Sequence, residues 1–198
     1  MNMVCLDLEG VLVPEIWIAF AEASGIPELR RTTRDEPDYD KLMRYRIGIL
    51  REHGLGLKQI QKTIDSIDPL TGATEFLDEL RSITQAVVVS DTFTQFADPL
   101  IKKLNRPTLL CNELIVEDGM ITGVRMRLKE SKLNTVRGLQ AIGYETIAVG
   151  DSFNDIGMIR ESKAGFLFRS TDAIKAANPD IASCDTFSEL MRYIKEAL

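Results

Sequence analysis

Beyond residue 69, short apolar runs alternate with segments of helical periodicity as far as the last residue. The expected strands cover residues 85–89, 108–111, 146–149 and 165–168. Helices are expected over residues 72–83, 93–104, 133–142, 155–162, 171–177 and 186–197. Strands that alternate with helices form a mainly parallel sheet covered on both faces, with a functional site at the carboxyl ends of the strands. The pattern therefore predicts an α/β fold.

The segment between the first strand and residue 69 has a different pattern. An apolar strand is expected over residues 3–8, and no convincing strand follows it before residue 85. Helical spacing recurs over residues 14–23, 39–52 and 57–67, and Asp38 is placed to cap the second of these helices. We therefore predict an all-helical insert, residues 14–69, within a core made of residues 1–13 and 70–198.

One hairpin is expected beside the parallel strands. Asp118-Gly119 lies between two short extended runs, residues 114–117 and 120–127. An Asp-Gly pair supplies the positive φ angles that a two-residue hairpin turn requires. The two runs are therefore predicted to pair as antiparallel strands.

Two acidic motifs each follow directly on an expected strand. The sequence DLEGV, residues 7–11, follows the first strand, and GDSFND, residues 150–155, follows the strand at 146–149. The carboxylates that converge at these strand ends repel one another unless a cation lies between them, and Mg²⁺ prefers oxygen ligands. The motifs therefore predict a magnesium site for phosphoryl transfer, with ligands from Asp7, Glu9, Asp151 and Asp155.

The first motif also supplies a nucleophile and an acid/base. An aspartate is ionised at neutral pH, so Asp7 needs no base before it attacks phosphorus to form an aspartyl-phosphate. Glu9 points to the same side of the strand as Asp7. It is placed to protonate the leaving alkoxide and then to deprotonate the acceptor that resolves the intermediate. We predict Asp7 and Glu9 as catalytic residues.

The phosphoryl oxygens need positive charge and hydrogen-bond donors. Ser90, at the end of its expected strand, offers a hydroxyl, and Lys132, at the start of a helix, offers an ammonium. Asn154 is predicted to hold the substrate side, and Asp155 the waters of the metal. Each of these motifs and residues alone also occurs in ordinary turns. The prediction therefore depends on finding all of them in order, each at the end of a strand or the start of a helix.

Composition excludes several other classes of function. The formal net charge is −6, and no run of Lys or Arg is long enough to follow a nucleic-acid backbone. His53 is the only histidine, which excludes a histidine-rich zinc site. The three cysteines have no Cys-x-x-Cys spacing, so reduced core thiols are expected. No apolar run approaches a membrane span and the N-terminal residues do not resemble a signal peptide, so the cytosol is the expected compartment.

The four motifs, the DLEGV sequence, Ser90, Lys132 and the GDSFND sequence, resemble those of the haloacid dehalogenase superfamily over essentially the whole chain. The resemblance implies a Rossmann-like core, Mg²⁺, an aspartyl-phosphate, and a small helical cap formed by the insert. The runs CLDLEGVLVPEIWIAFAE and SDTF are most similar to phosphoserine phosphatases that also transfer the phosphoryl group to homoserine. Most superfamily phosphatases have Asp in place of Glu9, and phosphoserine phosphatases usually have Gly in place of Asp91. A homodimer is compatible with this resemblance.

The insert carries the residues predicted to select the substrate. Tyr39, Met43 and Arg46 share one helix face, and an Arg beside apolar residues suits a carboxylate. Glu15 is placed to bind an ammonium, and Asp91 either adds an anion near the phosphate or turns toward an ammonium. By pattern alone, Arg46 also fits a packing helix with a side chain that extends to solvent. The resemblance favours phosphoserine, because phosphoserine phosphatases place comparable residues on their substrate.

Three functions follow from these residues. The first is a Mg²⁺-dependent phosphoserine phosphatase that also transfers the phosphoryl group to homoserine. The second is a phosphatase with the same chemistry for another small phosphate ester. The third is a non-catalytic phospho-acceptor module in which Asp7 stores a signal. The helical insert and Glu9 argue against the third function, since a stored phosphate gains nothing from a neighbouring acid/base.

Overall fold

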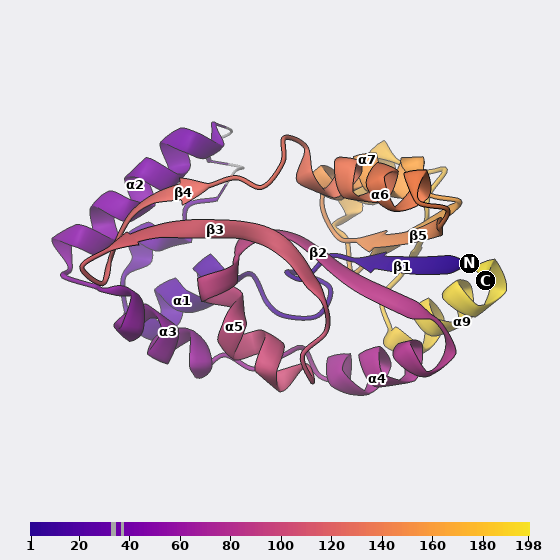
Figure 1. The fold of residues 1–198 in the computed structure, drawn as a ribbon, viewed down its shortest axis with the longest axis horizontal. Helices are drawn as coiled ribbons and strands as arrows, with labels where there is room; N and C mark the ends of the chain where they lie inside the picture. Colours follow the sequence, from indigo (N-terminus) through magenta and orange to yellow (C-terminus); the bar gives the residue numbers. More distant parts are fainter. Residues whose placement is uncertain (33–34, 37) are drawn as a thin grey trace.

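The computed structural model describes residues 1–32, 35–36 and 38–198, and these contain one seven-stranded sheet with the order β4-β3-β2-β1-β5-β6-β7 (Figure 1). The strands are β1 (Asn2–Leu6), β2 (Gln85–Phe93), β3 (Leu109–Glu117), β4 (Met120–Arg125), β5 (Glu145–Gly150), β6 (Ala164–Phe168) and β7 (Ala182–Cys184). Only the β3–β4 pair is antiparallel. The predicted α/β fold with a mainly parallel sheet is confirmed.

Helices cover both faces of the sheet, as the alternation predicts. One face carries α4 (Ala73–Ile83), α5 (Thr94–Lys103) and α9 (Phe187–Ala197), and the other carries α6 (Ser131–Ala141) and α7 (Ile156–Glu161) (Figure 1). Helix α8 (Asp172–Ala177) belongs to the second face, because its Ile174 lies in the same buried cluster as residues of α6 and α7. Successive side chains of a strand point to opposite faces. Val4 and Leu6 accordingly belong to one buried cluster, and Cys5 belongs to the other. The central strand β1 is therefore apolar throughout its buried part.

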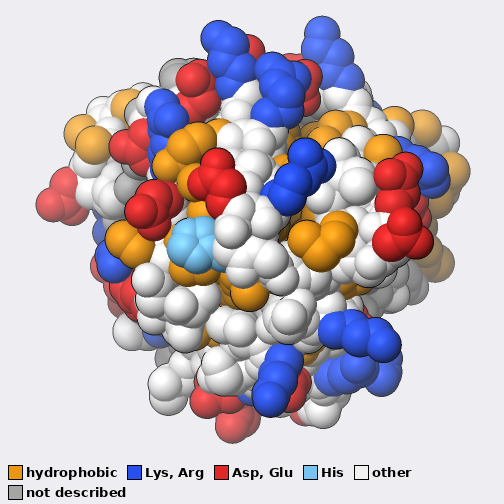
Figure 2. Space-filling model, turned by 90° about the vertical axis from the view of Figure 1, so that its left-hand side faces the viewer, with side chains coloured by type: hydrophobic (Ala, Val, Ile, Leu, Met, Phe, Trp, Pro, Cys, Tyr) orange, Lys and Arg blue, Asp and Glu red, His pale blue; other side chains and the backbone are white. Residues whose placement is uncertain are grey.

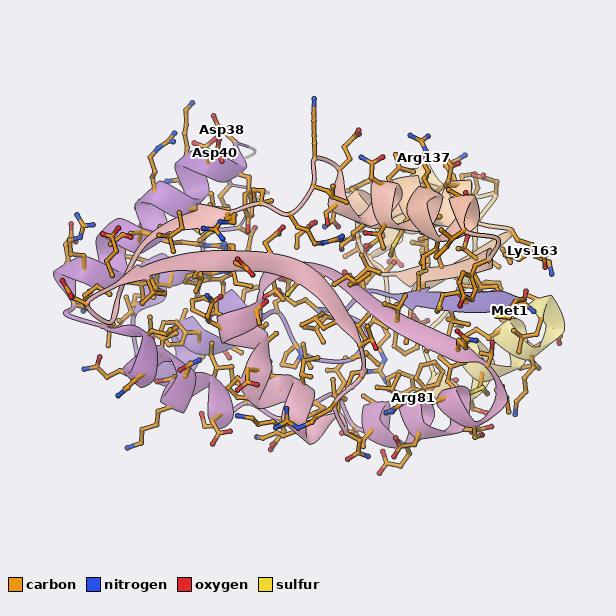
Figure 3. The ribbon with its side chains drawn as sticks, viewed as in Figure 1. Met1, Asp38, Asp40, Arg81, Arg137 and Lys163 are labelled. Atoms are coloured by element: carbon orange, nitrogen blue, oxygen red, sulfur yellow. The ribbon has the colours of Figure 1, made fainter. Side chains whose placement is uncertain are left out.

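Between residue 14 and β2, every regular element in the described part of the chain is helical. The predicted insert contains α1 (Ile16–Ser24), the short 3₁₀ helix η1 (Pro27–Arg30), α2 (Tyr39–Glu52) and α3 (Leu57–Asp65). Helix α2 begins where predicted, because the Asp38 carboxylate accepts a hydrogen bond from the Lys41 amide (3.0 Å) at the end marked in Figure 3. The main apolar cluster runs without interruption from these helices to the sheet. The division into a separate cap and core stays a prediction.

The β3–β4 hairpin corrects one detail of the sequence prediction. The two runs predicted at 108–111 and 114–117 are not separate, because residues 109–117 form the single strand β3. The polar Asn112 and Glu113 interrupt the apolar run without interrupting the backbone ladder. The turn itself is as predicted, with φ of 49° at Asp118 and 79° at Gly119. Its tip is fastened to the helical insert, since the Leu57 amide donates to the Gly119 carbonyl (2.8 Å).

Strand β2 is also longer than predicted, because it continues past Ser90 to Phe93. The register with β3 shifts between Val89 and Phe93, so the intervening residues leave the regular ladder. The edge strand β7 was not predicted, because a three-residue Ala-Ser-Cys run has no apolar alternation to reveal it.

Among the described side chains, neither sign of charge forms a continuous patch on the end of the molecule that carries the helical insert (Figure 2). Figure 2 shows Lys and Arg side chains interspersed with Asp and Glu side chains on this face. Within the described ranges, no helix has both the length and the apolar character that crossing a bilayer requires.

Candidate active site

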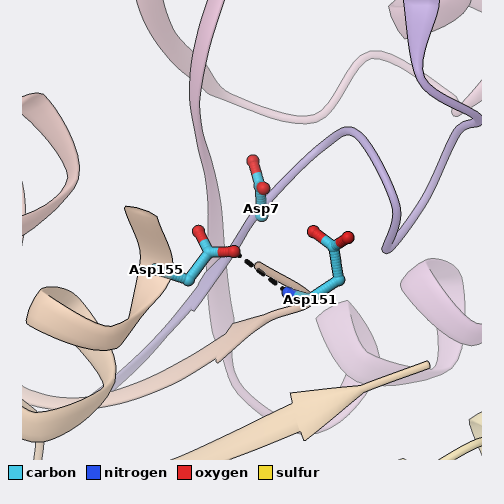
Figure 4. Close-up of side chains that lie close together, drawn as sticks. All are labelled: Asp7, Asp151 and Asp155. Carbon is cyan, nitrogen blue, oxygen red and sulfur yellow. Dashed lines mark hydrogen bonds between the residues drawn. The ribbon is translucent and has the colours of Figure 1, made fainter. Parts of the chain in front are cut away.

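The two acidic motifs meet because β1 and β5 are neighbouring parallel strands. Leu6 pairs with Val149, and the Asp7 amide extends this ladder by donating to the Val149 carbonyl (2.9 Å). Carboxylate oxygens of Asp7, Asp151 and Asp155 all lie within 4.8 Å of one another (Figure 4). The convergence that the sequence predicts for these side chains is therefore present in the structure.

Lys132 lies inside this carboxylate cluster, although it comes from the start of α6. Its ammonium donates to Asp7 Oδ2 (2.8 Å) and to Asp155 Oδ1 (2.6 Å), and the side chain is only 4% exposed. Burial alone would lower the pKa of Lys132, but the two carboxylates outweigh burial and hold the pKa above its usual value. Lys132 is therefore a permanent positive charge beside Asp7.

One ammonium does not balance three carboxylates. Burial, followed by the charge of Asp155, raises the pKa of Asp7 well above its ordinary value, and Lys132 only partly opposes this shift. The same two causes raise the pKa of Asp151 to about 7. An excess of buried negative charge with oxygen donors on one side suits a hard divalent cation. The residues present therefore fit a divalent metal ion.

Asp151 and Asp155 differ in how much of their hydrogen-bonding capacity is already used. Asp155 Oδ2 accepts from the amides of Asp151 (3.0 Å) and Ser152 (2.9 Å), and its Oδ1 accepts from Lys132. Among the described residues, no other residue donates a hydrogen bond to the Asp151 carboxylate. Asp151 is therefore the carboxylate best placed to bind a metal directly, and Asp155 holds the loop that presents it.

Two glycines allow the close approach of these carboxylates. A Cβ atom at Gly10 would lie 2.3 Å from Asp151 Cγ, and Gly10 has a φ of +76° that other residues rarely adopt. A Cβ atom at Gly150 would lie 2.2 Å from the Asp155 Cβ. The glycine in each motif is therefore required by the packing of an acidic side chain from the second motif.

The Glu9 side chain is not part of the cluster formed by the three aspartates. Its Oε2 accepts a hydrogen bond from the Ile16 amide (2.9 Å), the first residue of α1. Burial, and after it the charge of Glu15, raises the pKa of Glu9 to about 7. A carboxyl with such a pKa can donate and accept a proton near neutral pH, as the predicted acid/base role requires.

Ser90 and Asp91 lie where β2 leaves the ladder, between Val89 and Phe93. Ser90 is 2% exposed, and its hydroxyl accepts from the Thr92 amide (3.2 Å). Asp91 Oδ2 accepts from the Asn154 side-chain amide (3.0 Å). The structure therefore brings Asp91 and Asn154 together, although they are 63 residues apart in the sequence.

Asn112 is a site-supporting residue that the sequence reasoning did not find. It is fully buried on β3, donates from Nδ2 to the Asp91 carbonyl (3.0 Å), and accepts at Oδ1 from the Arg127 amide (2.9 Å). It thereby ties the Ser90–Asp91 segment to the loop that leads to Lys132. A polar amide within an otherwise apolar strand is the sequence signal that would have pointed to it.

Arg46 is buried rather than extended to solvent, which contradicts the alternative of a snorkelling side chain. It is 5% exposed, donates from Nη2 to the Arg31 carbonyl (2.7 Å), and lies over the Trp17 ring. Its Nε has no hydrogen-bond partner in the described part of the chain. Burial lowers the pKa of Arg46 to about 10, against the raising effects of Tyr39, Glu9 and Glu15. Glu15 itself is exposed, immediately before α1.

Comparison with known proteins agrees with this geometry. A family model described as haloacid dehalogenase-like hydrolase matches residues 1–163, and the chain belongs to this family. A Pseudomonas aeruginosa protein named phosphoserine phosphatase ThrH is 47% identical over 198 residues, which cover all of this chain and 97% of that protein. A Pseudomonas syringae pv. tomato protein named phosphoserine phosphatase is 48% identical over 96% of this chain and 81% of its own length.

Solved structures show the same fold. A substrate-bound phosphoserine phosphatase complex superposes with a TM-score of 0.79 at 25% identity, over 97% of each chain. A phosphoserine phosphatase in the apo form superposes with a TM-score of 0.78 at 25% identity, over 97% of this chain and 98% of that one. The seven-stranded arrangement described above is therefore the fold of that group of structures.

Proposed function

We propose that this protein is a Mg²⁺-dependent phosphoserine phosphatase of the cytosol that works through an aspartyl-phosphate on Asp7. The observation that carries the proposal is the buried triangle of Asp7, Lys132 and Asp155 beside the open carboxylate of Asp151. The names of the similar proteins, which match this chain over nearly its full length, support phosphoserine as the substrate.

In the first half of the reaction, a carboxylate oxygen of Asp7 attacks phosphorus, and the bond between phosphorus and the serine oxygen breaks. Glu9 in its protonated form gives its proton to the departing oxygen, so serine leaves as a neutral alcohol. In the second half, Glu9 takes a proton from water as the water attacks phosphorus. The bond to Asp7 breaks, phosphate is released, and both side chains return to their starting states.

In this proposal, Asp7, Asp151 and the Glu9 carbonyl would hold the metal, and Asp155 would orient its waters. Bound Mg²⁺ would neutralise negative charge on the phosphoryl oxygens. Lys132 contributes a fixed ammonium to the same charge, and its bonds to Asp7 and Asp155 keep that ammonium in place without ligand. Lys132 is thus already positioned before substrate binds.

The substrate's amino-acid part is assigned to the other side of the site. Arg46 has an Nε without a partner among the described residues, and a carboxylate would satisfy two of its donors at once. Glu15 is proposed to receive the ammonium. Ser90 and Asn154 are proposed to donate to the phosphoryl group. Together these receptors describe a phosphorylated amino acid.

We further propose that homoserine competes with water as the acceptor. Its hydroxyl is chemically equivalent to water as a partner for Glu9. Asp91 supports this second reaction, because it adds a half-exposed carboxylate, held by Asn154, that suits the ammonium of an incoming amino acid. Incubation with phosphoserine and homoserine, scored for phosphohomoserine against free phosphate, measures the partition.

The Asp7→Asn substitution tests the main proposal. It is expected to reduce phosphoserine turnover with Mg²⁺ by at least about 1,000-fold, because the amide is not a nucleophile toward phosphorus. Asp65→Asn, at the exposed end of α3, is the matched control and should retain full activity. Unchanged turnover by the Asp7→Asn protein would refute the proposal.

The same assay separates the rival functions. A higher kcat/KM for phosphoglycolate or a nucleoside monophosphate than for phosphoserine would identify another phosphate ester as the substrate. A long-lived phosphorylated protein that releases no inorganic phosphate would indicate a phospho-acceptor module.

A further inference from the structure

Trp17 is held rigidly at the junction between the helical insert and the sheet. It is the only tryptophan, lies in the first turn of α1, and is 7% exposed. Its ring meets Phe96 of α5 edge-on at 5.1 Å between centroids, and Phe20 at 6.3 Å. Phe96 in turn packs against Phe93 at the end of β2 (5.9 Å). Rings packed on several sides have few alternative orientations, so the indole plane is fixed.

The indole also contacts the Arg46 guanidinium. Arg46 Cζ lies 4.4 Å from the Trp17 ring centroid, well within the range of a cation–π contact. Within the described residues, this guanidinium donates a hydrogen bond to the Arg31 carbonyl (2.7 Å) and a long one to Met43 Sδ (3.8 Å). The stacked indole is therefore a main constraint on the orientation of the guanidinium.

The kind of constraint matters for binding. A guanidinium has five N–H donors, and every carboxylate or carbonyl that fixes it uses one or more of them. A π face fixes the plane of the group without using any donor. The contact with Trp17 therefore leaves donors of Arg46 available in a desolvated place, where a bidentate bond to a carboxylate is strongest.

We propose that Trp17 is a positioning residue for substrate selection, which orients the Arg46 guanidinium so that the site prefers phosphorylated amino acids to phosphate esters without a carboxylate. The proposal deepens the function proposed above and rests on it, since it assumes that Arg46 binds the substrate carboxylate. Trp17 itself touches neither the phosphoryl group nor the metal ligands in this scheme.

The test compares phosphoserine with O-phosphoethanolamine, which keeps the phosphate and the ammonium but lacks the carboxylate. Trp17→Leu keeps an apolar side chain and removes the π face. It is expected to lower kcat/KM for phosphoserine about 10-fold and to change kcat/KM for phosphoethanolamine less than about 2-fold. The kcat/KM of Trp17→Phe for phosphoserine should lie between the values of the unsubstituted protein and Trp17→Leu, because a benzene ring is a weaker π partner than an indole.

Two controls separate positioning from a general loosening of the helical insert. Phe20→Leu alters the same aromatic cluster one helical turn away, and it should leave the ratio of the two kcat/KM values unchanged. In an Arg46→Ala background, Trp17→Leu should have no further effect on phosphoserine, because the group that it positions is gone. Thermal unfolding of each variant shows whether it is folded. If Trp17→Leu is not folded, the same comparison is made with Trp17→Phe.

The outcomes are distinguishable. Suppose first that the unsubstituted protein prefers phosphoserine. An equal loss of kcat/KM on both substrates in Trp17→Leu would then overturn the positioning role. So would a Trp17→Leu effect on phosphoserine that is just as large in the Arg46→Ala background. If the unsubstituted protein had nearly the same kcat/KM for phosphoserine and for O-phosphoethanolamine, the proposed substrate would be wrong, and the positioning role with it.

Discussion

The two halves of the site differ in how completely the protein satisfies its own charged groups. In the phosphoryl half, Lys132 bonds both Asp7 (2.8 Å) and Asp155 (2.6 Å). In the amino-acid half, Glu15 is the exposed N-cap residue of α1, and its side chain makes no capping hydrogen bond within the described residues. Arg46 keeps a buried Nε without a partner in the same part of the chain. The contacts of Lys132 are therefore made by folding alone, whereas in the proposed function the amino-acid half is completed by the substrate.

The difference follows from where each half is anchored. The phosphoryl half lies at the ends of β1 and β5, which are tied to the sheet by backbone hydrogen bonds. The amino-acid half comes from helices of the insert, whose link to Asp91 is a long hydrogen bond from the Tyr39 hydroxyl (3.4 Å). Damage to the first half should therefore affect every substrate, and damage to the second should affect selection among substrates.

The largest effect is expected from Lys132→Met. This substitution leaves two buried carboxylates without their counter-charge, which typically costs about 3–5 kcal/mol of stability. It should also reduce turnover of phosphoserine and of O-phosphoethanolamine alike, each by more than about 1,000-fold. Urea unfolding and steady-state kinetics with saturating Mg²⁺ measure the two losses.

The matched control for that substitution is Lys163→Met, which removes an exposed ion pair with Glu145 on the far side of the domain (Lys163 is labelled in Figure 3). It should change stability by less than about 1 kcal/mol. If Lys132→Met spared phosphoethanolamine but not phosphoserine, the division of the site into two halves would be wrong.

A smaller and selective effect is expected from Arg46→Ala. Loss of a charge-assisted carboxylate pair should lower kcat/KM for phosphoserine about 100-fold, and phosphoethanolamine should be affected less than about 3-fold. Arg44→Ala, an exposed arginine on the same helix, is the control and should leave both values unchanged. A comparable loss on both substrates would show that Arg46 serves the phosphoryl half.

The smallest effect concerns Glu9, whose pKa is raised by burial and by the charge of Glu15 and is lowered by the Ile16 amide, Lys132 and Arg46. The folded protein raises this pKa from 4.5 to about 7, so it binds the proton more tightly than the unfolded chain does. The resulting stability is fully present below about pH 4.5 and is lost as the pH rises through about 7.

Glu9→Gln should therefore flatten the dependence of unfolding free energy on pH. Relative to this variant, the unsubstituted protein should lose about 1–3 kcal/mol between pH 5 and pH 8, since one pKa unit corresponds to about 1.4 kcal/mol. Urea unfolding with EDTA at four pH values measures the difference. Glu52→Gln, exposed at the end of α2, is the control. Parallel curves for Glu9→Gln and the unsubstituted protein would contradict the raised pKa.

Several features of this protein are properties of short stretches of sequence, and these were predictable. The Asp38 cap, the Asp118-Gly119 turn and the alternation of strands with helices each depend on residues within a few positions of one another. That Asp7 and Asp151 follow directly on apolar strands is equally local. Because parallel strands share one carboxyl edge, this local fact was enough to predict that the two side chains lie near each other.

Tertiary structure alone decided which groups actually touch. The bond between Lys132 and Asp7 joins residues 125 positions apart, and it exists because β1 lies between β2 and β5 in the sheet. Likewise, the burial of Arg46 under Trp17 and the bridge formed by Asn112 depend on how the insert and the hairpin pack. Local propensity acts over a helical turn or a strand, whereas these contacts are set by strand order and by the shape of the core, to which the whole chain contributes.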